Sequence, residues 1–282
     1  MNEKEVRALV ERMIVELAGQ APTPQVKGAD YHPMERESTA GDGCLDDISE
    51  IDLRRQYLVK DPRNGPAFLD LKRKTPARLG VGRAGARYKT ITMLRMRADH
   101  AAAQDSVFSH VDEAFVDQNG WVFTQTLCAD KDEYLTRPDR GRRFDEQNQA
   151  IIQKTFGRSP KVALVVGDGL SSAAIEANAA DCMQAIRAGL EAYGIPPGPV
   201  LFVKYCRVGA CDHIGDLTGA EVVCMLVGER PGLVTAESMS AYVTYQPHIG
   251  IPESKRTVVS NIHRQGTTAV EAGAHIAELI HR

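Results

Sequence analysis

Hydrophobic and polar positions follow a strand-like pattern in the second half of the chain. Five apolar, β-branched runs bounded by Gly or Pro predict buried strands at 161–166, 199–205, 221–227, 240–246 and 256–260. Helical spacing predicts helices at 172–194, 213–219 and 268–281. Strands too apolar to alternate, separated by helices, are typical of a mostly parallel sheet covered on both faces. We therefore expect an α/β fold in which residues 158–282 form a Rossmann-like domain.

The pattern before residue 158 is mainly helical. Apolar spacing predicts helices at 47–57, 65–74, 90–103 and 142–156, and the sequence WVFTQTL predicts one short strand ahead of the last of them. We interpret residues 47–157 as a mainly helical domain.

The start of the chain combines an amphipathic pattern with a polar stretch. Residues 1–19 place apolar side chains at spacings of three and four, which predicts a helical N-terminal region. Residues 20–46 are rich in Pro, Gly and polar side chains and predict a flexible linker. A lone helix of this length is marginal in water, so we expect it to dock on another surface.

Composition and charge narrow the class of protein. Apolar residues make up 43% and charged residues 25% of the 282 residues, as in globular proteins with a packed core. No apolar run reaches the roughly 18 residues that a membrane span needs, and the chain does not start with the apolar region of a signal peptide. We therefore expect a cytoplasmic protein that has no membrane partner.

The six cysteines are scattered and include no CxxC pair, which predicts reduced, packed thiols. Cys206, Cys211 and His213 come nearest to a metal-binding pattern. No second pair completes the four ligands that zinc requires, so we expect no metal site.

A basic block spans residues 71–97, which hold nine Lys or Arg and no acid although the whole chain has a net charge of −3. Such a block could bind nucleic acid, a phosphate-bearing cofactor or an acidic partner surface, or it could be a solvated helix end. Tyr88 is its one aromatic residue, which argues against base stacking. We expect no nucleic-acid partner. An RNA-binding module stays an alternative that steep salt-dependent RNA affinity would support.

Polar motifs follow the predicted strands, at the edge where parallel sheets bind ligands. GDGLSS (167–172) resembles part of a dinucleotide fingerprint, but its third glycine is missing, and Lys204 and Arg207 stand where a ribose-binding acid is expected. An Asp-Gly turn with a serine N-cap explains the motif more simply. An NAD(P)-binding oxidoreductase stays the alternative function. No nucleophile elbow, P-loop, HExxH or paired-carboxylate motif is present, so we expect no catalytic residue in this chain.

The ordered set GRAGAR (82–87), YLTRPDRGRR (134–143), GDGLSS, VGERPGL and SNIHRQGT resembles the small subunit of ethanolamine ammonia-lyase across residues 75–281. The resemblance implies an adenosylcobalamin-dependent lyase that converts ethanolamine into acetaldehyde and ammonia. It implies that a large subunit holds the reaction while the small subunit closes over the cobalamin, so that the chain is active only in the hetero-oligomer. It also implies a place inside a bacterial microcompartment, because the N-terminal helix looks like an encapsulation peptide.

The resemblance assigns site residues as well. It implies that Glu229 accepts hydrogen bonds from cobalamin amides and that Val208 and Val258 are further contacts. Arg207, beside Val208, is a candidate for the phosphate of the nucleotide loop. Two structural alternatives stay open: Glu229 could form an internal ion pair with Arg230 or Arg207, and Val208 could simply pack at a strand end.

The motifs depart from the family pattern at two places. Many relatives have Cys where Val258 stands, so a contact there must use backbone or apolar surface. Relatives commonly show SNIHxGGT, whereas this chain has Arg264, Gln265 and a single Gly266, which leaves the conformation of that loop open.

Overall fold

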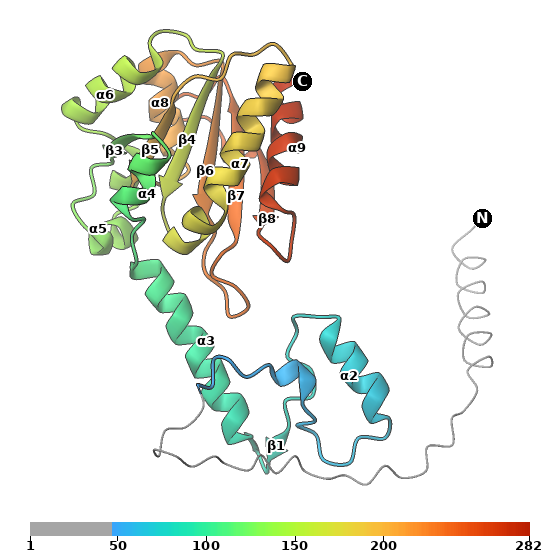
Figure 1. Cartoon of the computed structure of the whole chain (residues 1–282). Helices are drawn as coiled ribbons and strands as arrows, with labels where there is room; N and C mark the ends of the chain where they lie inside the picture. The colour runs from blue at the N-terminus through green and yellow to red at the C-terminus, as the bar shows by residue number, and fades with distance from the viewer. Residues whose placement is uncertain (1–46) are drawn as a thin grey trace, which may run out of the picture. The chain divides into compact units, whose positions relative to one another are not determined.

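The structure is a computed structural model that describes residues 47–282 (Figure 1). The helix predicted at 1–19 and the linker predicted at 20–46 lie outside the described residues, so both stay predictions. Within the described part of the chain, no helix is long and apolar enough to cross a membrane.

A six-stranded mixed sheet forms the centre of the fold, with the strand order β3-β5-β4-β6-β7-β8. Its strands are β3 (Val122–Gln125), β4 (Val162–Asp168), β5 (Val200–Lys204), β6 (Val222–Gly228), β7 (Met239–Tyr245) and β8 (Arg256–Ile262). The first three pairs in this order are parallel and the last two are antiparallel, so β7 alone runs against the others. The α/β class and the mostly parallel sheet predicted from the sequence are confirmed.

Helices cover the two faces of the sheet (Figure 1). The helices that cover these faces are α6 (Glu146–Phe156), α7 (Ser172–Ala192), α8 (Ala210–Thr218) and α9 (Ala269–His281). Leu164 and Val166 of β4 pack in one buried cluster with α7 and α9, whereas Ala163 and Val165 pack in a second cluster with α6 and α8. Neighbouring side chains of a strand point to opposite faces of the sheet. A strand that is buried on both faces is therefore apolar throughout and does not alternate between apolar and polar residues.

Short helices and one loop differ from the sequence prediction. The structure adds α4 (Glu113–Gln118) and α5 (Lys131–Thr136), which are too short to show a helical period. The helix predicted at 47–57 is wrong, because this segment holds only the 3₁₀ turn η1 (Leu53–Arg55). Asp47 and Asp52 accept hydrogen bonds from the backbone two residues ahead, and such local bonds compete with a helix.

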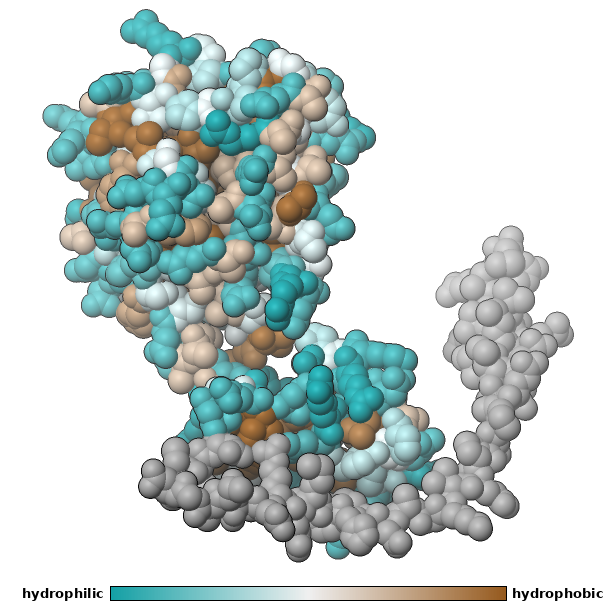
Figure 2. Space-filling model, viewed as in Figure 1, coloured by the Kyte–Doolittle hydropathy of each residue, from teal (hydrophilic) through white to brown (hydrophobic). Residues whose placement is uncertain are grey.

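The segment before the sheet exposes much of its apolar surface. It contains the helices α2 (Gly65–Arg73) and α3 (Thr90–Phe108), and a hairpin of β1 (Arg83–Ala84) and β2 (Arg87–Tyr88). Leu71, Met93, Leu94 and Phe108 are all exposed on the two helices. Figure 2 shows apolar groups set among hydrophilic ones on this part of the surface.

Candidate functional site

A hollow of about 330 Å³ lies at the ends of β5 and β6, beside β7 and β8. Its apolar lining includes Leu170, Val227 and the Tyr242 ring. Polar groups of Ser240 and Ser260 line it as well. All four residues singled out from the sequence, Arg207, Val208, Glu229 and Val258, lie on the wall of this one hollow.

The hollow lies over a part of the sheet that is not fully buried. Met225, Tyr242 and Val258 stand side by side on β6, β7 and β8, in register across the sheet. Met225 is fully buried, Tyr242 is half-buried, and Val258 is 46% exposed. Burial therefore decreases strand by strand towards β8, which leaves an apolar floor open to a ligand.

Glycine at the end of β6 fixes the position of the next residue, Glu229. A Cβ at Gly228 would lie 2.2 Å from the Ser171 carbonyl oxygen, so the strand can approach the start of α7 this closely only without a side chain. The Glu229 backbone N–H then donates to the Ser238 carbonyl at 2.8 Å. The carboxylate is thus held at the tip of a rigid strand.

The Glu229 carboxylate joins three strands by hydrogen bonds. Oε2 accepts from the Ser238 hydroxyl at 2.6 Å, and Oε1 accepts from the Ser240 hydroxyl at 2.5 Å and from the Asn261 N–H at 3.0 Å. Across residues 47–282 it forms no ion pair with Arg230 or Arg207, which was the structural alternative. A carboxylate offers about four acceptor positions, so one position, on Oε2, is left for a donor from outside.

These hydrogen bonds also set the charge of Glu229. Burial alone would raise the pKa of this carboxyl, but the hydroxyls of Ser238 and Ser240, the Asn261 N–H and nearby His263 together hold the pKa below its usual value. Glu229 is therefore an anion at neutral pH and acts as a fixed acceptor.

Arg207 brings a guanidinium to the same hollow. Its Nη2 donates to the Tyr134 carbonyl at 2.6 Å, and its guanidinium carbon lies 4.5 Å from the centre of the Tyr134 ring. Its backbone N–H donates to the Gly141 carbonyl at 2.9 Å, which joins the YLTRPDRGRR motif to the hollow. The buried Nε has no hydrogen-bond partner among the described residues. Because Arg207 lines the hollow, the exposed part of its guanidinium is the donor that a ligand could use.

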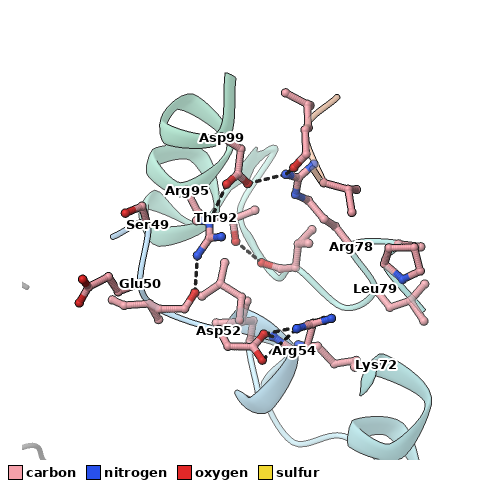
Figure 3. A pocket seen from close by; sticks show the side chains of 18 of the residues that line it. Ser49, Glu50, Asp52, Arg54, Lys72, Arg78, Leu79, Thr92, Arg95 and Asp99 are labelled. Carbon is pink, nitrogen blue, oxygen red and sulfur yellow. Dashed lines mark hydrogen bonds and ion pairs between the residues drawn. The ribbon is translucent and has the colours of Figure 1, made fainter. Parts of the chain in front are cut away.

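A second pocket, of about 260 Å³, lies mainly around η1, α2 and α3 (Figure 3). Arg95 Nε donates to Asp99 Oδ1 at 2.8 Å, and Arg78 donates to the other oxygen of the same carboxylate. Lys72 Nζ donates to the Gln56 carbonyl at 2.7 Å. Because these cations already have hydrogen-bond acceptors within the protein, we interpret them as structural contacts that hold this segment together.

The GDGLSS loop is filled by the protein's own contacts. Asp168 accepts hydrogen bonds from the Val111 N–H at 3.1 Å and from the Ser172 hydroxyl at 2.9 Å. Ser171 caps α7 by accepting from the Ala174 N–H. The serine N-cap is therefore confirmed, and the Asp-Gly step forms a bend at the end of β4.

The cysteines and the nearby histidine point in different directions. The thiols of Cys206 and Cys211 each lie 3.7 Å from Met225 Sδ, whereas His213 Nδ1 accepts from the Phe144 N–H at 3.2 Å. Burial raises the pKa of Cys211 to about 12, which makes it an inert packing group. The five cysteines within the described range are all free and buried, as predicted. No metal-binding cluster occurs among these residues.

Comparison with known proteins assigns a family to this architecture. The family model "Ethanolamine ammonia-lyase light chain (EutC)" matches residues 66–282. The chain is 60% identical to the ethanolamine ammonia-lyase small subunit of Clostridioides difficile (strain 630), over 99% of this chain and 95% of that protein. It is 58% identical to that of Clostridium perfringens (strain ATCC 13124), over 99% and 95%, and 53% identical to that of Listeria monocytogenes serotype 4a (strain HCC23), over 100% and 96%. The chain belongs to the ethanolamine ammonia-lyase small-subunit family.

Membership explains the motifs that the sequence brought together. Ethanolamine ammonia-lyase is a lyase of ethanolamine degradation, and the alternative of an NAD(P) oxidoreductase is not favoured. Sequence reasoning missed Ser238, Ser240 and Tyr242, because only the pairing of β6 with β7 brings them to Glu229. The alternating serines in SMSAY were the available signal.

The loop at the end of β8 also has a defined conformation in this member of the family. Asn261 adopts a left-handed φ of 61°, and its side-chain oxygen lies 2.8 Å from His263 Nε2. A Cβ at Gly266 would lie 2.3 Å from the Asn261 carbonyl oxygen. The single glycine that this chain keeps is therefore the one that the turn requires.

We expect Glu229→Gln to lower the free energy of unfolding of the full-length chain by about 1–2 kcal/mol at pH 7, because it weakens hydrogen bonds to a charged acceptor. A carboxyl with a lowered folded-state pKa stabilises the fold above its usual pKa and loses that contribution as the pH falls through the folded value. The difference between parent and variant should therefore be constant from pH 7 to 5 and shrink below about pH 4.5. Urea unfolding at each pH measures it.

Glu237→Gln is the control for this experiment, because Glu237 is an exposed acid of the same β6–β7 connection. Its side chain forms no hydrogen bond or ion pair within the described range. A pH profile that is the same for both variants would contradict the assigned role of Glu229.

Proposed function

We propose that this chain is the adenosylcobalamin-clamping small subunit of ethanolamine ammonia-lyase, which acts with a large subunit to convert ethanolamine into acetaldehyde and ammonia. One observation carries the proposal. The three residues that the family resemblance singles out, Val208, Glu229 and Val258, come from three separate segments and line the same hollow, together with the neighbouring candidate Arg207.

The chemistry of the hollow fits the rim of a corrin ring. Val208, Val258 and the Tyr242 ring offer apolar surface to the macrocycle. Glu229 keeps one acceptor position for a side-chain amide, and the Arg207 guanidinium on the wall of the hollow is a donor for an amide carbonyl or a phosphate. When bound, adenosylcobalamin would supply the radical chemistry that takes hydrogen from the substrate.

The size of the hollow supports a shared site. Its volume of about 330 Å³ lies at the lower end of the range of roughly 300–1,000 Å³ that is common for small-molecule sites. A ligand as large as cobalamin can place only part of its rim there, so another polypeptide must cover the rest. The chain's own residues bind and orient this rim, and activity therefore depends on the large subunit.

The basic block is our proposed contact with that large subunit. Arg83 and Arg87 lie on the β1–β2 hairpin, where both are exposed. Leu71 on α2 and Met93 on α3, both within the basic block, expose apolar surface as well. Apolar surface with a basic rim suits an acidic protein partner better than nucleic acid, because Tyr88 is the one aromatic available for stacking.

The N-terminal helix predicted at 1–19 has a proposed role of its own, in attaching the enzyme to the shell of a cytoplasmic microcompartment. The support is its amphipathic pattern and the Pro- and Gly-rich stretch that follows it. Docking on the large subunit is the alternative.

Val258→Glu should weaken adenosylcobalamin binding by the large–small subunit complex at least tenfold, because it puts a charge on the apolar floor of the hollow. Val258 is 46% exposed, so the fold should tolerate the change. Val270→Glu on α9 is the matched control, since Val270 is 59% exposed and lies outside the hollow. Equilibrium dialysis measures the affinity. Unchanged affinity in a Val258→Glu complex with a normal melting temperature would refute the clamp.

Charge reversal at the hairpin, Arg83→Glu with Arg87→Glu, should reduce assembly with the large subunit. The effect should be largest at low salt, where charges are least screened. Arg158→Glu serves as the control, because Arg158 is exposed in a turn after α6. Size-exclusion chromatography of mixed subunits measures assembly. Normal assembly of the double variant would contradict the proposal that the basic block contacts the large subunit.

Deleting residues 1–19 should release the enzyme from microcompartment shells while its specific activity stays within about twofold of the parent. Co-sedimentation with purified shells and an ammonia-release assay measure the two properties. Loss of activity, with shell binding intact, would favour docking on the large subunit instead.

A further inference from the structure

Tyr242 carries a polar group in the hollow that no described residue satisfies. Its ring packs against the core cluster on the α6 and α8 side of the sheet, while the residue also lines the hollow. The Tyr134 hydroxyl, by contrast, donates to the Cys206 carbonyl at 3.3 Å, and the Tyr245 hydroxyl accepts from Gln246 at 3.3 Å. The Tyr242 hydroxyl forms no hydrogen bond within residues 47–282. A fixed ring with a free hydroxyl is a preorganised donor.

A β-bulge in β8 helps to fix Glu229, the acceptor that lines the same hollow as this donor. Ala241 pairs with Val259 and Met239 pairs with Ile262, so Ser240 stands opposite two residues of β8 instead of one. The extra residue, Asn261, turns its N–H onto Glu229 Oε1, while Ile262 returns to the core on the other face. Oε1 therefore has two donors, and the remaining acceptor position of Glu229 lies on Oε2.

The two groups are complementary in kind. A carboxylate can only accept hydrogen bonds, whereas a neutral phenol can donate one. Burial, together with the negative charges of Glu229 and Glu253, raises the pKa of Tyr242 although Arg256 lowers it, so the phenol keeps its proton at neutral pH. A primary carboxamide presents an N–H and a C=O side by side, and it suits such a pair of acceptor and donor.

We propose that Tyr242 and Glu229 together read one primary carboxamide of the bound ligand: Glu229 Oε2 accepts its N–H, and the Tyr242 hydroxyl donates to its carbonyl oxygen. This inference rests on the proposed function and adds to it a second ligand-contacting side chain, Tyr242, that shares one amide with Glu229. Although Arg207 and Arg230 also line the hollow, a ligand carboxylate placed against Glu229 Oε2 would offer no N–H to this acceptor and would be repelled by it, so the site selects an amide at this position.

Tyr242→Phe tests the inference, because it removes only the hydroxyl. In the complex with the large subunit it should weaken adenosylcobalamin binding about three- to tenfold, as expected for one hydrogen bond. Tyr245→Phe is the matched control, since it makes the same change on the same strand at a residue that is 59% exposed outside the hollow. Equilibrium dialysis gives the affinities, and melting temperatures verify the fold.

A second arm uses adenosylcobalamin derivatives in which a single peripheral amide has been hydrolysed to a carboxylate. The parent complex should bind one such derivative at least tenfold more weakly than adenosylcobalamin, and Tyr242→Phe should add little to that loss, because the same amide is already gone. A full additional loss with every derivative, or parent-like binding by Tyr242→Phe, overturns the inference.

Val258→Glu separates the two levels of the proposal. If Val258→Glu weakens binding but Tyr242→Phe does not, the amide-reading role alone is overturned. If neither variant changes the affinity, the clamp itself is overturned with it.

Discussion

The Glu229 carboxylate is the contact on which the ligand face of this sheet depends. It follows directly on the end of β6 and accepts hydrogen bonds from β7 and from the bulge of β8, so three strands are tied at one point. Ion pairing would have neutralised the charge, whereas hydroxyls and an amide N–H hold it in place as an anion. The antiparallel end of the sheet makes this possible, because β7 returns its serines to the tip of β6.

The hollow is a consequence of how helices cover the sheet. Side chains of β4 pack against helices on both faces, whereas Val258 at the far edge is half open. An apolar strand face of this kind is unfavourable in water unless something covers it. Here the lining carries one anion, Glu229, two cations, Arg207 and Arg230, and a free hydroxyl on Tyr242. This combination favours a ligand with both apolar and amide surface over a plain protein contact.

Local sequence signals were sufficient for the sheet but not for the site. The run at 221–227 predicted its strand because, after Glu221, burial on both faces leaves no polar residue in it. The helix expected at 47–57 failed because aspartate side chains bond their own backbone there. Ser240 and Tyr242 could not be assigned from spacing, since antiparallel pairing brings them beside Glu229. The family resemblance supplied Glu229, Val208 and Val258, and the fold explains why these distant residues meet.

The make-up of the hollow is that of a binding surface. The thiols of Cys206 and Cys211 are buried and inert. The hollow offers instead side chains fixed by their neighbours: a carboxylate held by three donors, a guanidinium over the Tyr134 ring and a phenol whose ring is packed. Such groups lose little entropy when a ligand binds. Under the proposed function, the reaction resides in the large subunit and this chain contributes specificity for the rim of the cofactor.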